Sequence, residues 1–228
     1  MLEELKKRVY EANLLLPKYD LVKFTWGNVS EIDEESKIVA IKPSGVDYDK
    51  LKVEDIVLVN LDGEIIEGEK KPSSDTKTHL EIYKKFAEVK GIVHTHSPYA
   101  TSWAQAGIDI PCFGTTHADY IYSDVPVLRN LTQEEIDDDY EKNTGLLIVD
   151  YMKDKEFTKT PAVLLKNHGS FVWGKDCFDA VHNSVVLEEV AKMATFTILI
   201  NPNAEKTPKR VQDKHYYRKH GKNAYYGQ

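Results

Sequence analysis

The sequence contains little cysteine and no long hydrophobic run. Its only two cysteines, Cys112 and Cys177, lie far apart, and neither belongs to a Cys-x-x-Cys pair. This argues against a disulfide framework and against a zinc site built on thiolates. Residues 1–16 mix charged and apolar side chains, so they lack the continuous apolar core of a signal peptide. No segment approaches the roughly 18 consecutive apolar residues of a membrane span. We therefore expect a cytoplasmic protein with no membrane partner.

Basic residues are also fewer than acidic ones. Lys and Arg number 30 against 37 Asp and Glu, which gives a formal net charge of −7. Nucleic-acid binding needs a concentrated basic face, so we expect no nucleic-acid partner. A local basic pocket for a small anion is compatible with this balance. Apolar residues make up 41% of the 228 residues, enough for the core of one compact domain.

Hydrophobic periodicity predicts a mixture of helices and strands. Helical spacing predicts helices over 2–16 and over about 176–199. Strand-like runs lie at 21–33, 36–43, 55–68, 91–96 and 161–174, and Asp62-Gly63 is typical of a hairpin turn. The acidic run 134–141 is interpreted as a solvated helix face. Because helices flank the strands without regular alternation, we expect a single α/β domain, 1–228, with a mixed or mainly antiparallel central sheet flanked by helices.

Three histidines carry the metal hypothesis. His94 and His96 stand two apart in a predicted strand, so their side chains project to the same side. Such a pair alone is a weak signal, since buried histidines are more often structural. His168, followed at once by Gly169, supplies a third imidazole at a strand end. Three histidines leave one position of a zinc ion open, as in catalytic sites. Asp75 is a candidate fourth ligand or a nearby base.

Two short stretches are typical of anion-binding loops. One carries Lys42, Ser44 and Gly45, and the other carries Ser73 and Ser74 just before a predicted helix. Small residues let backbone N–H groups approach a phosphate closely, and a helix N-terminus adds a favourable dipole. Each stretch alone is also an ordinary turn. Together, and beside a metal site, they predict a phosphorylated substrate.

Motifs in order along the whole chain resemble the class II aldolase family, and within it most closely the sugar-phosphate 4-epimerases. The motifs are TWGNVS (25–30), KPSG (42–45), PSSDT (72–76), HTH (94–96), GTTHADY (114–120), NHG (167–169) and DKHYYRKHGKNAYYGQ (213–228). The resemblance implies Zn²⁺, or another divalent metal such as Mn²⁺ or Co²⁺, held by His94, His96 and His168. It also implies Asp75 as a metal ligand.

The implied activity is a metal-dependent isomerase of carbohydrate metabolism. It would interconvert L-ribulose 5-phosphate and D-xylulose 5-phosphate by breaking and re-forming the C3–C4 bond. Related aldolases use a glutamate as acid/base where this chain has Asp75. The shorter side chain favours a group held against the metal, and hence an epimerase. An aldolase that releases dihydroxyacetone phosphate and an aldehyde is the alternative, and a non-catalytic interaction module is a third. Arabinose breakdown and other pentose routes both stay open.

The resemblance also assigns roles to residues. It implies Asp119 and Tyr226 as the two acid/base groups, with Tyr225 as the rival of Tyr226. Thr115, His215 and Arg218 are expected to support them. Phosphate contacts are implied for Gly27, Asn28, Lys42, Ser44, Gly45, Ser73 and Ser74. The tail, from about residue 208 to 228, is expected to contribute to the active site of an adjacent subunit in a homotetramer.

Overall fold

A computed structural model describes residues 2–222 and 224–226 of the chain. The described residues form one sheet of eight strands in the order β4-β3-β2-β1-β5-β8-β7-β6. The strands are β1 Asn28–Ile32, β2 Val39–Ile41, β3 Val57–Val59, β4 Ile65–Glu67, β5 Gly91–Thr95, β6 Val127–Leu128, β7 Ala162–Leu165 and β8 Ser170–Gly174. Neighbouring strands are antiparallel except β6 and β7, which are parallel.

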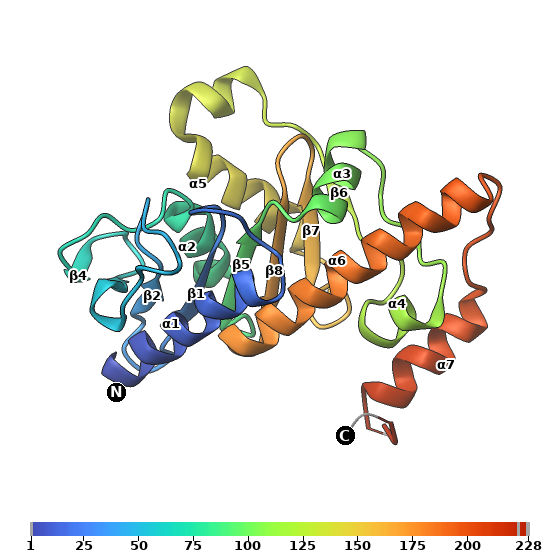
Figure 1. Cartoon of the computed structure of the whole chain (residues 1–228), viewed down its shortest axis with the longest axis horizontal. Helices are drawn as coiled ribbons and strands as arrows, with labels where there is room; N and C mark the ends of the chain where they lie inside the picture. The colour runs from blue at the N-terminus through green and yellow to red at the C-terminus, as the bar shows by residue number, and fades with distance from the viewer. Residues whose placement is uncertain (1, 223, 227–228) are drawn as a thin grey trace.

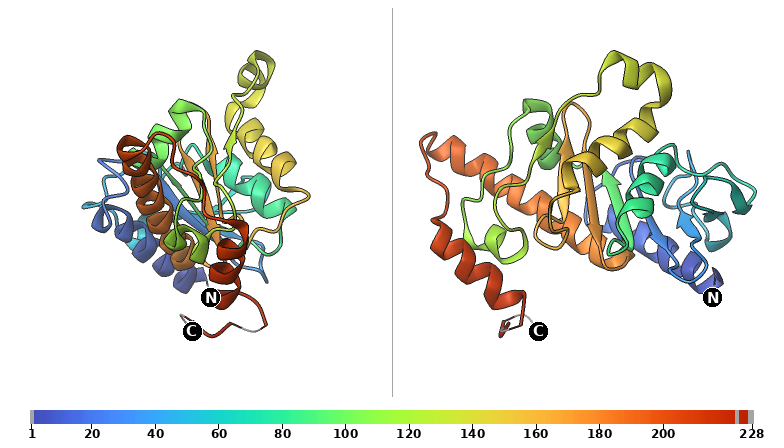
Figure 2. Two further views of the ribbon diagram at one scale, coloured as in Figure 1. Left: turned by 90° about the vertical axis from the view of Figure 1, so that its right-hand side faces the viewer. Right: turned by 180° about the vertical axis from the view of Figure 1, so that it is seen from behind.

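Helices cover both faces of the sheet. They are α1 Leu2–Lys18, α2 Thr76–Lys85, α3 Pro98–Ala106, α4 Thr115–Tyr120, α5 Gln133–Met152, α6 Cys177–Ile200 and α7 Lys209–Lys219, with a short 3₁₀ helix η1 at Val53–Asp55. Figure 1 shows α1, α3 and α6 over one face, and Figure 2 shows α2 and α5 over the other. The predicted α/β fold with a mixed, mainly antiparallel sheet flanked by helices is confirmed.

Alternation along the central strands divides the core between the two layers. On β5, Val93 packs in the cluster under α1, α3 and α6, while Ile92 packs in the cluster under α2 and α5. On β8, Val172 and Phe171 divide in the same way. Side chains two apart therefore share a face, as the pleat of a strand requires. His94 lies on the α2–α5 side and stacks on Phe171, with ring centroids 4.3 Å apart.

The predicted elements need correction at their ends. The first helix continues past residue 16 to Lys18, because a proline in the last turn removes only a hydrogen bond near the helix end. The run 21–33 is a strand only from Asn28, because Phe24 and Gly27 have φ of 52° and 74°, which a strand does not accommodate. The run 161–174 is a hairpin of β7 and β8 rather than one segment.

The acidic run 134–141 does lie in a helix, but that helix is not regular. Asp139, with φ −153° and ψ 91°, interrupts α5.

At the other end of the molecule, α7 packs beside α4 (Figure 1). None of the helices in the described ranges combines the length and the apolar character needed to cross a membrane.

Candidate metal centre and phosphate cradle

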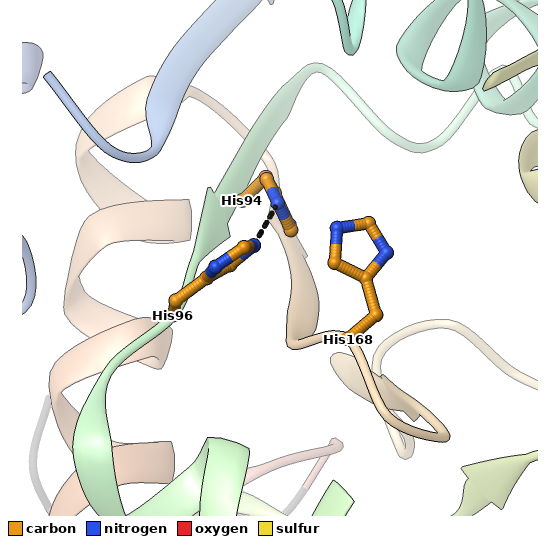
Figure 3. Close-up of side chains that lie close together, drawn as sticks. All are labelled: His94, His96 and His168. Carbon is orange, nitrogen blue, oxygen red and sulfur yellow. Dashed lines mark hydrogen bonds between the residues drawn. The ribbon is translucent and has the colours of Figure 1, made fainter. Parts of the chain in front are cut away.

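The three predicted histidines meet at one end of the sheet. His94 lies near the end of β5, His96 follows that strand, and His168 lies in the turn between β7 and β8. Because β5 pairs with β8, this turn is brought to the end of β5. The ring centroids lie 4.8 to 5.0 Å apart. One nitrogen of each ring lies within 4.8 Å of the others, an arrangement suited to a metal ion (Figure 3).

The chemistry of these nitrogens fits a divalent cation. The carbonyl oxygen of Ser170 lies 2.8 Å from His94 Nδ1 and accepts its proton, which leaves Nε2 as a ligand atom. That Nε2 lies 3.0 Å from His96 Nε2, a separation that suits either one proton between the two nitrogens or a cation bound by both. Partial loss of solvation, assisted by the neighbouring histidines, lowers the pKa of His96 and of His168 to about 4, although His96 is still exposed and His168 half-buried. Both rings are therefore in the neutral form that binds metals at neutral pH.

Asp75 lies beside the histidines at the start of α2. Its Oδ2 accepts hydrogen bonds from Asn28 Nδ2 at 2.7 Å and from Ser73 Oγ at 3.3 Å. Burial alone would raise the pKa of Asp75, but nearby His94 and the bond from Asn28 help to outweigh it and lower the pKa. In the described chain, the close group of ligand atoms comes from the histidines without Asp75. Its role as a fourth ligand stays a prediction.

A cavity of about 410 Å³ opens on the histidines and Asp75. Its walls include every predicted phosphate contact: Gly27, Asn28, Lys42, Ser44, Gly45, Ser73 and Ser74. The two loops that carry the serines are joined edge to edge. Ser44 N–H donates to the carbonyl of Lys71 at 2.9 Å, and Ser73 N–H donates to that of Lys42 at 3.0 Å. These two N–H groups therefore hold the loops together. The Ser73 hydroxyl already donates to Asp75, so the hydroxyls of Ser44 and Ser74 are the ones available as donors to a ligand.

Lys42 is almost fully buried, with 2% of its surface exposed. Its ammonium donates to the carbonyl of Val46 at 2.7 Å and lies 4.7 Å from the ring centre of Tyr48. Burial lowers its pKa to about 8. The ammonium thus bonds to the turn that forms one wall of the cavity, and the lowered pKa shows that burying its charge there costs free energy. The Tyr48 hydroxyl donates to the carbonyl of Gly27 at 2.9 Å, and this bond holds Gly27 in place in the cavity wall.

The cavity also includes residues that the sequence analysis missed. They are Thr25, Trp26, Pro43, Tyr140 and Glu141. Thr25, Trp26 and Pro43 lie within the recognised motifs TWGNVS and KPSG, so the motifs themselves were an available signal. Tyr140 and Glu141 belong to the acidic run that was interpreted as a solvated face. The available local signal is Asp139, whose carboxylate accepts the Lys142 N–H at 3.3 Å as in a helix N-cap, but the neighbouring acidic residues hide it.

A second cluster forms around Asp119 on α4. Its carboxylate accepts hydrogen bonds from Arg218 at 3.0 and 2.8 Å, and His215 Nδ1 lies 3.1 Å from it. The Arg218 guanidinium lies 4.2 Å from the ring centre of Tyr226. Thr115 is exposed at the first position of α4. The structure thus groups Asp119 with the tail residues, but none of these residues lines the histidine cavity of the same chain.

The tyrosines of the tail are both exposed. Tyr225 has 64% of its surface exposed and Tyr226 50%, so burial does not separate the two rivals. Their surroundings do differ, since Lys214 lies 5.1 Å from the Tyr225 ring and Arg218 lies closer to the Tyr226 ring. Tyr226 therefore shares its guanidinium partner with Asp119, whereas Tyr225 is associated with a lysine outside that cluster.

Comparison with known proteins identifies the family. The chain matches the model of the class II aldolase and adducin N-terminal domain over residues 7–195, and it belongs to this family. Among solved structures it is similar to an L-fuculose 1-phosphate aldolase, with 27% identity, a TM-score of 0.79, and coverage of 94% of this chain and 95% of the other. It is also similar to YgbL of Klebsiella pneumoniae, provisionally described as an aldolase/epimerase/decarboxylase, with 25% identity, a TM-score of 0.74, and coverage of 92% and 97%.

A third structure extends the likeness of the fold. The L-fuculose-1-phosphate aldolase of Thermus thermophilus is 24% identical, with a TM-score of 0.70 and coverage of 89% of this chain and 98% of that one. The matched proteins are thus of nearly the same length as this chain. The family and the histidine group together indicate a metal-binding enzyme of the aldolase/epimerase type.

Proposed function

We propose that the protein is a divalent-metal-dependent 4-epimerase that interconverts L-ribulose 5-phosphate and D-xylulose 5-phosphate. The observation that carries the proposal is the tethering of Asp75. Its short carboxylate is held by Asn28 and Ser73 beside the histidines, in the cavity that also contains the phosphate cradle. A carboxylate held in this way favours the metal over the reacting carbon, so the proton transfers require other groups.

The position of the carbonyl group dictates the chemistry. In a 2-ketopentose, carbon 3 is next to the carbonyl and carbon 4 is not, so the proton on carbon 4 is too weakly acidic to remove. Inversion at carbon 4 instead proceeds by retro-aldol cleavage of the C3–C4 bond. The electrons of that bond pass to the enediolate of dihydroxyacetone, and carbons 4 and 5 leave as glycolaldehyde phosphate. Addition to the opposite face of this aldehyde gives the epimer, with no net loss of atoms or electrons.

The histidine group contributes electrostatic stabilisation. A divalent cation held by His94, His96 and His168, with Asp75, supplies positive charge near the oxygens of carbons 2 and 3, where negative charge develops. His94 is oriented for this task by the carbonyl of Ser170. The lowered pKa values of His96 and His168 keep both rings neutral and available as ligands.

The phosphate cradle explains why the cleaved aldehyde would stay. In a ketopentose 5-phosphate, the phosphate belongs to the aldehyde fragment. Gly27, Asn28 and the two serine-bearing loops, with Lys42 behind the turn, would hold this fragment while its carbonyl group turns over. In a ketose 1-phosphate, the phosphate belongs to the other fragment, and the aldehyde is free to leave. The same cavity therefore suits epimerisation of one substrate and cleavage of the other.

Proton transfer is assigned to Asp119 and Tyr226, one on each side of the aldehyde. His215 and Arg218 would position Asp119, and Thr115 would lie close by at the start of the same helix. Because this cluster does not line the cavity of its own chain, an adjacent subunit has to supply it. We therefore include a homotetramer with shared active sites in the proposal, and Tyr225 as the alternative to Tyr226.

An aldolase is the second candidate. It is favoured by the 27% identity to an L-fuculose 1-phosphate aldolase, which extends over 94% of this chain. Such an enzyme would release dihydroxyacetone phosphate and an aldehyde from a ketose 1-phosphate. It would use the same metal centre and phosphate cradle, so the two candidates differ in which fragment carries the phosphate and in how long the aldehyde remains bound.

A product analysis separates the two candidates. The metal-loaded protein is incubated with L-ribulose 5-phosphate, and D-xylulose 5-phosphate, dihydroxyacetone and glycolaldehyde phosphate are measured in the same sample. A parallel sample contains L-fuculose 1-phosphate. Epimer without free fragments supports the epimerase, whereas cleavage of the 1-phosphate without epimer formation establishes the aldolase. His96→Asn should abolish turnover, and His182→Asn, which changes an exposed histidine outside the cavity, serves as the matched control.

A further inference from the structure

Helix α5 is broken at the point where it reaches the metal-site cavity. Asp139 has extended backbone angles within the helix, and the next two residues, Tyr140 and Glu141, line the cavity. Figure 1 shows the first turns of α5 bent away from the rest of the helix. A regular helix satisfies its own backbone hydrogen bonds, so a break requires compensating contacts.

Helix α5 supplies some of those contacts itself, since Asp139 Oδ1 accepts the Lys142 N–H at 3.3 Å, and α2 supplies others. Lys77 Nζ lies 2.7 Å from Asp139 Oδ2, and the buried Thr78 hydroxyl donates to the carbonyl of Glu141 at 2.6 Å. The helices also approach closely at Gly145, where an added Cβ would lie 2.8 Å from the Cβ of Glu81. Since α2 begins directly after Asp75, the helix that carries this acid also holds the broken segment of α5 in place.

Tyr140 is thereby directed at a metal-site histidine. Its hydroxyl oxygen lies 3.5 Å from His168 Nδ1, and the two ring centroids lie 6.2 Å apart. In Figure 3, the other ring nitrogen of His168 is turned toward His94, and the nitrogen next to the side-chain stem is turned away. The two nitrogens of His94 are arranged in the same way: Nδ1 bonds to the Ser170 carbonyl, and Nε2 faces the other metal-site histidines.

We infer that Tyr140 is a positioning residue for the metal centre. Its hydroxyl oxygen accepts the Nδ1–H of His168, which fixes the tautomer and ring orientation that leave Nε2 available to the metal. The 3.5 Å separation is at the long limit for a hydrogen bond, and the tyrosine side chain is partly exposed. The inference rests on the metal-binding part of the proposed function and not on the reaction.

Cobalt binding tests the inference without substrate. Tyr140→Phe removes the hydroxyl and keeps the ring, and Tyr151→Phe changes a tyrosine on the same helix outside the cavity. Co²⁺ affinity and the visible absorption spectrum of the Co²⁺-loaded protein are measured for wild type and both variants. We expect Tyr140→Phe to weaken Co²⁺ binding by about 10-fold or more and to change the spectrum. Tyr151→Phe should leave both unchanged. Thermal unfolding of the metal-free proteins checks that the variants are folded.

A second variant tests the contact that holds the break. Thr78→Val keeps the side-chain volume and removes the hydrogen bond to the Glu141 carbonyl. If α2 acts through Tyr140, Tyr140→Phe should weaken Co²⁺ binding less in the Thr78→Val background than in wild type. An unchanged affinity or an unchanged spectrum in folded Tyr140→Phe overturns the inference. If the wild-type protein binds no Co²⁺, the proposed metal site is overturned and the inference with it. This outcome differs from failure of the inference alone, in which wild type binds Co²⁺ and Tyr140→Phe binds it equally well.

Discussion

Arg218 donates two hydrogen bonds to the carboxylate of Asp119, from Nε to Oδ1 at 3.0 Å and from Nη2 to Oδ2 at 2.8 Å. This paired geometry joins α7 to α4 and is among the strongest side-chain contacts available in water. His220 adds a contact from its Nε2 to the Asp119 carbonyl at 2.8 Å. The tail is thus organised around the residue that is proposed to move protons.

Arg218→Met should raise the pKa of Asp119. Burial by itself raises that pKa, and the hydrogen bonds from Arg218 and His215 now lower it below its ordinary value. Loss of the guanidinium removes the larger of the two opposing bonds. If ionised Asp119 is the base, the acid limb of the profile of kcat/KM against pH should move up by about 1 unit or more. Arg210→Met, on the exposed surface of the same helix, is the control. An acid limb that stays in place would exclude Asp119 as the titrating base.

Metal removal should abolish turnover and lower the melting temperature. A ligand that binds only the folded state stabilises it by about 4 kcal/mol at a thousand-fold excess over its Kd. Activity and thermal unfolding are compared before chelation, after chelation, and after addition of Zn²⁺, Mn²⁺ or Co²⁺. His96→Asn removes one of the grouped nitrogens and should lose the metal-dependent rise in melting temperature. Full activity in a chelated sample shown by elemental analysis to be metal-free would contradict the proposed function.

Gly169→Ala should disturb the metal centre through a steric clash. A Cβ at this position would lie 2.6 Å from the carbonyl oxygen of Thr95 and 2.8 Å from Cδ2 of His96. Because Thr95 is fixed in β5, the imidazole and the turn have to move. We expect a loss of about 1–3 kcal/mol in unfolding free energy and a weaker affinity for Zn²⁺. Gly114→Ala is the control, since nothing lies within 4 Å of its added Cβ. Equal metal affinities in the two variants would show that the turn adapts.

Lys42 should make stability depend on pH in the alkaline range. Burial lowers its folded-state pKa from 10.5 to about 8, so the unfolded chain binds more protons between these values. Its contribution to stability is therefore present above pH 10.5 and is lost as the pH falls through about 8. From pH 7.5 to 9.5, wild type should gain about 2 kcal/mol relative to Lys42→Met. Urea unfolding of both proteins at the two pH values measures the difference. A constant difference would mean that Lys42 titrates normally.

Local sequence patterns predicted much of the site. The spacing of His94 and His96 predicted a shared side because a strand alternates with period two. The serines and glycines of two loops predicted an anion site, and the structure places both loops in the wall of the histidine cavity. Phosphate binding by these loops stays a prediction. Gly27 in the same wall shows why a small residue is needed there: its φ is 74°, and a Cβ there would lie 2.7 Å from the carbonyl oxygen of His94.

Other parts of the site depend on contacts between distant segments. His168 reaches His94 because β5 pairs with β8, and strand pairing between distant segments is set by the packing of both faces of the sheet. Tyr140 enters the cavity because α5 breaks at Asp139, which accepts the Lys142 N–H and is also held by Lys77 on α2. An aspartate at the start of a helix is a sequence signal, but the acidic residues around Asp139 hide it. An amphipathic or acidic pattern predicts which side of a segment is exposed to solvent, but it does not predict which distant residues the segment contacts.

The sequence by itself determined many of the central elements, the residue types of a candidate metal and phosphate site, and the resemblance to the family. These follow from periodicity and motif chemistry, which are local properties of the chain. The tertiary structure alone decided that the histidines and both serine-bearing loops share one cavity, while Asp119 pairs with Arg218 elsewhere in the same chain. Those outcomes depend on the order of strands and on helix-to-helix contacts, where many weak interactions between distant residues select one arrangement.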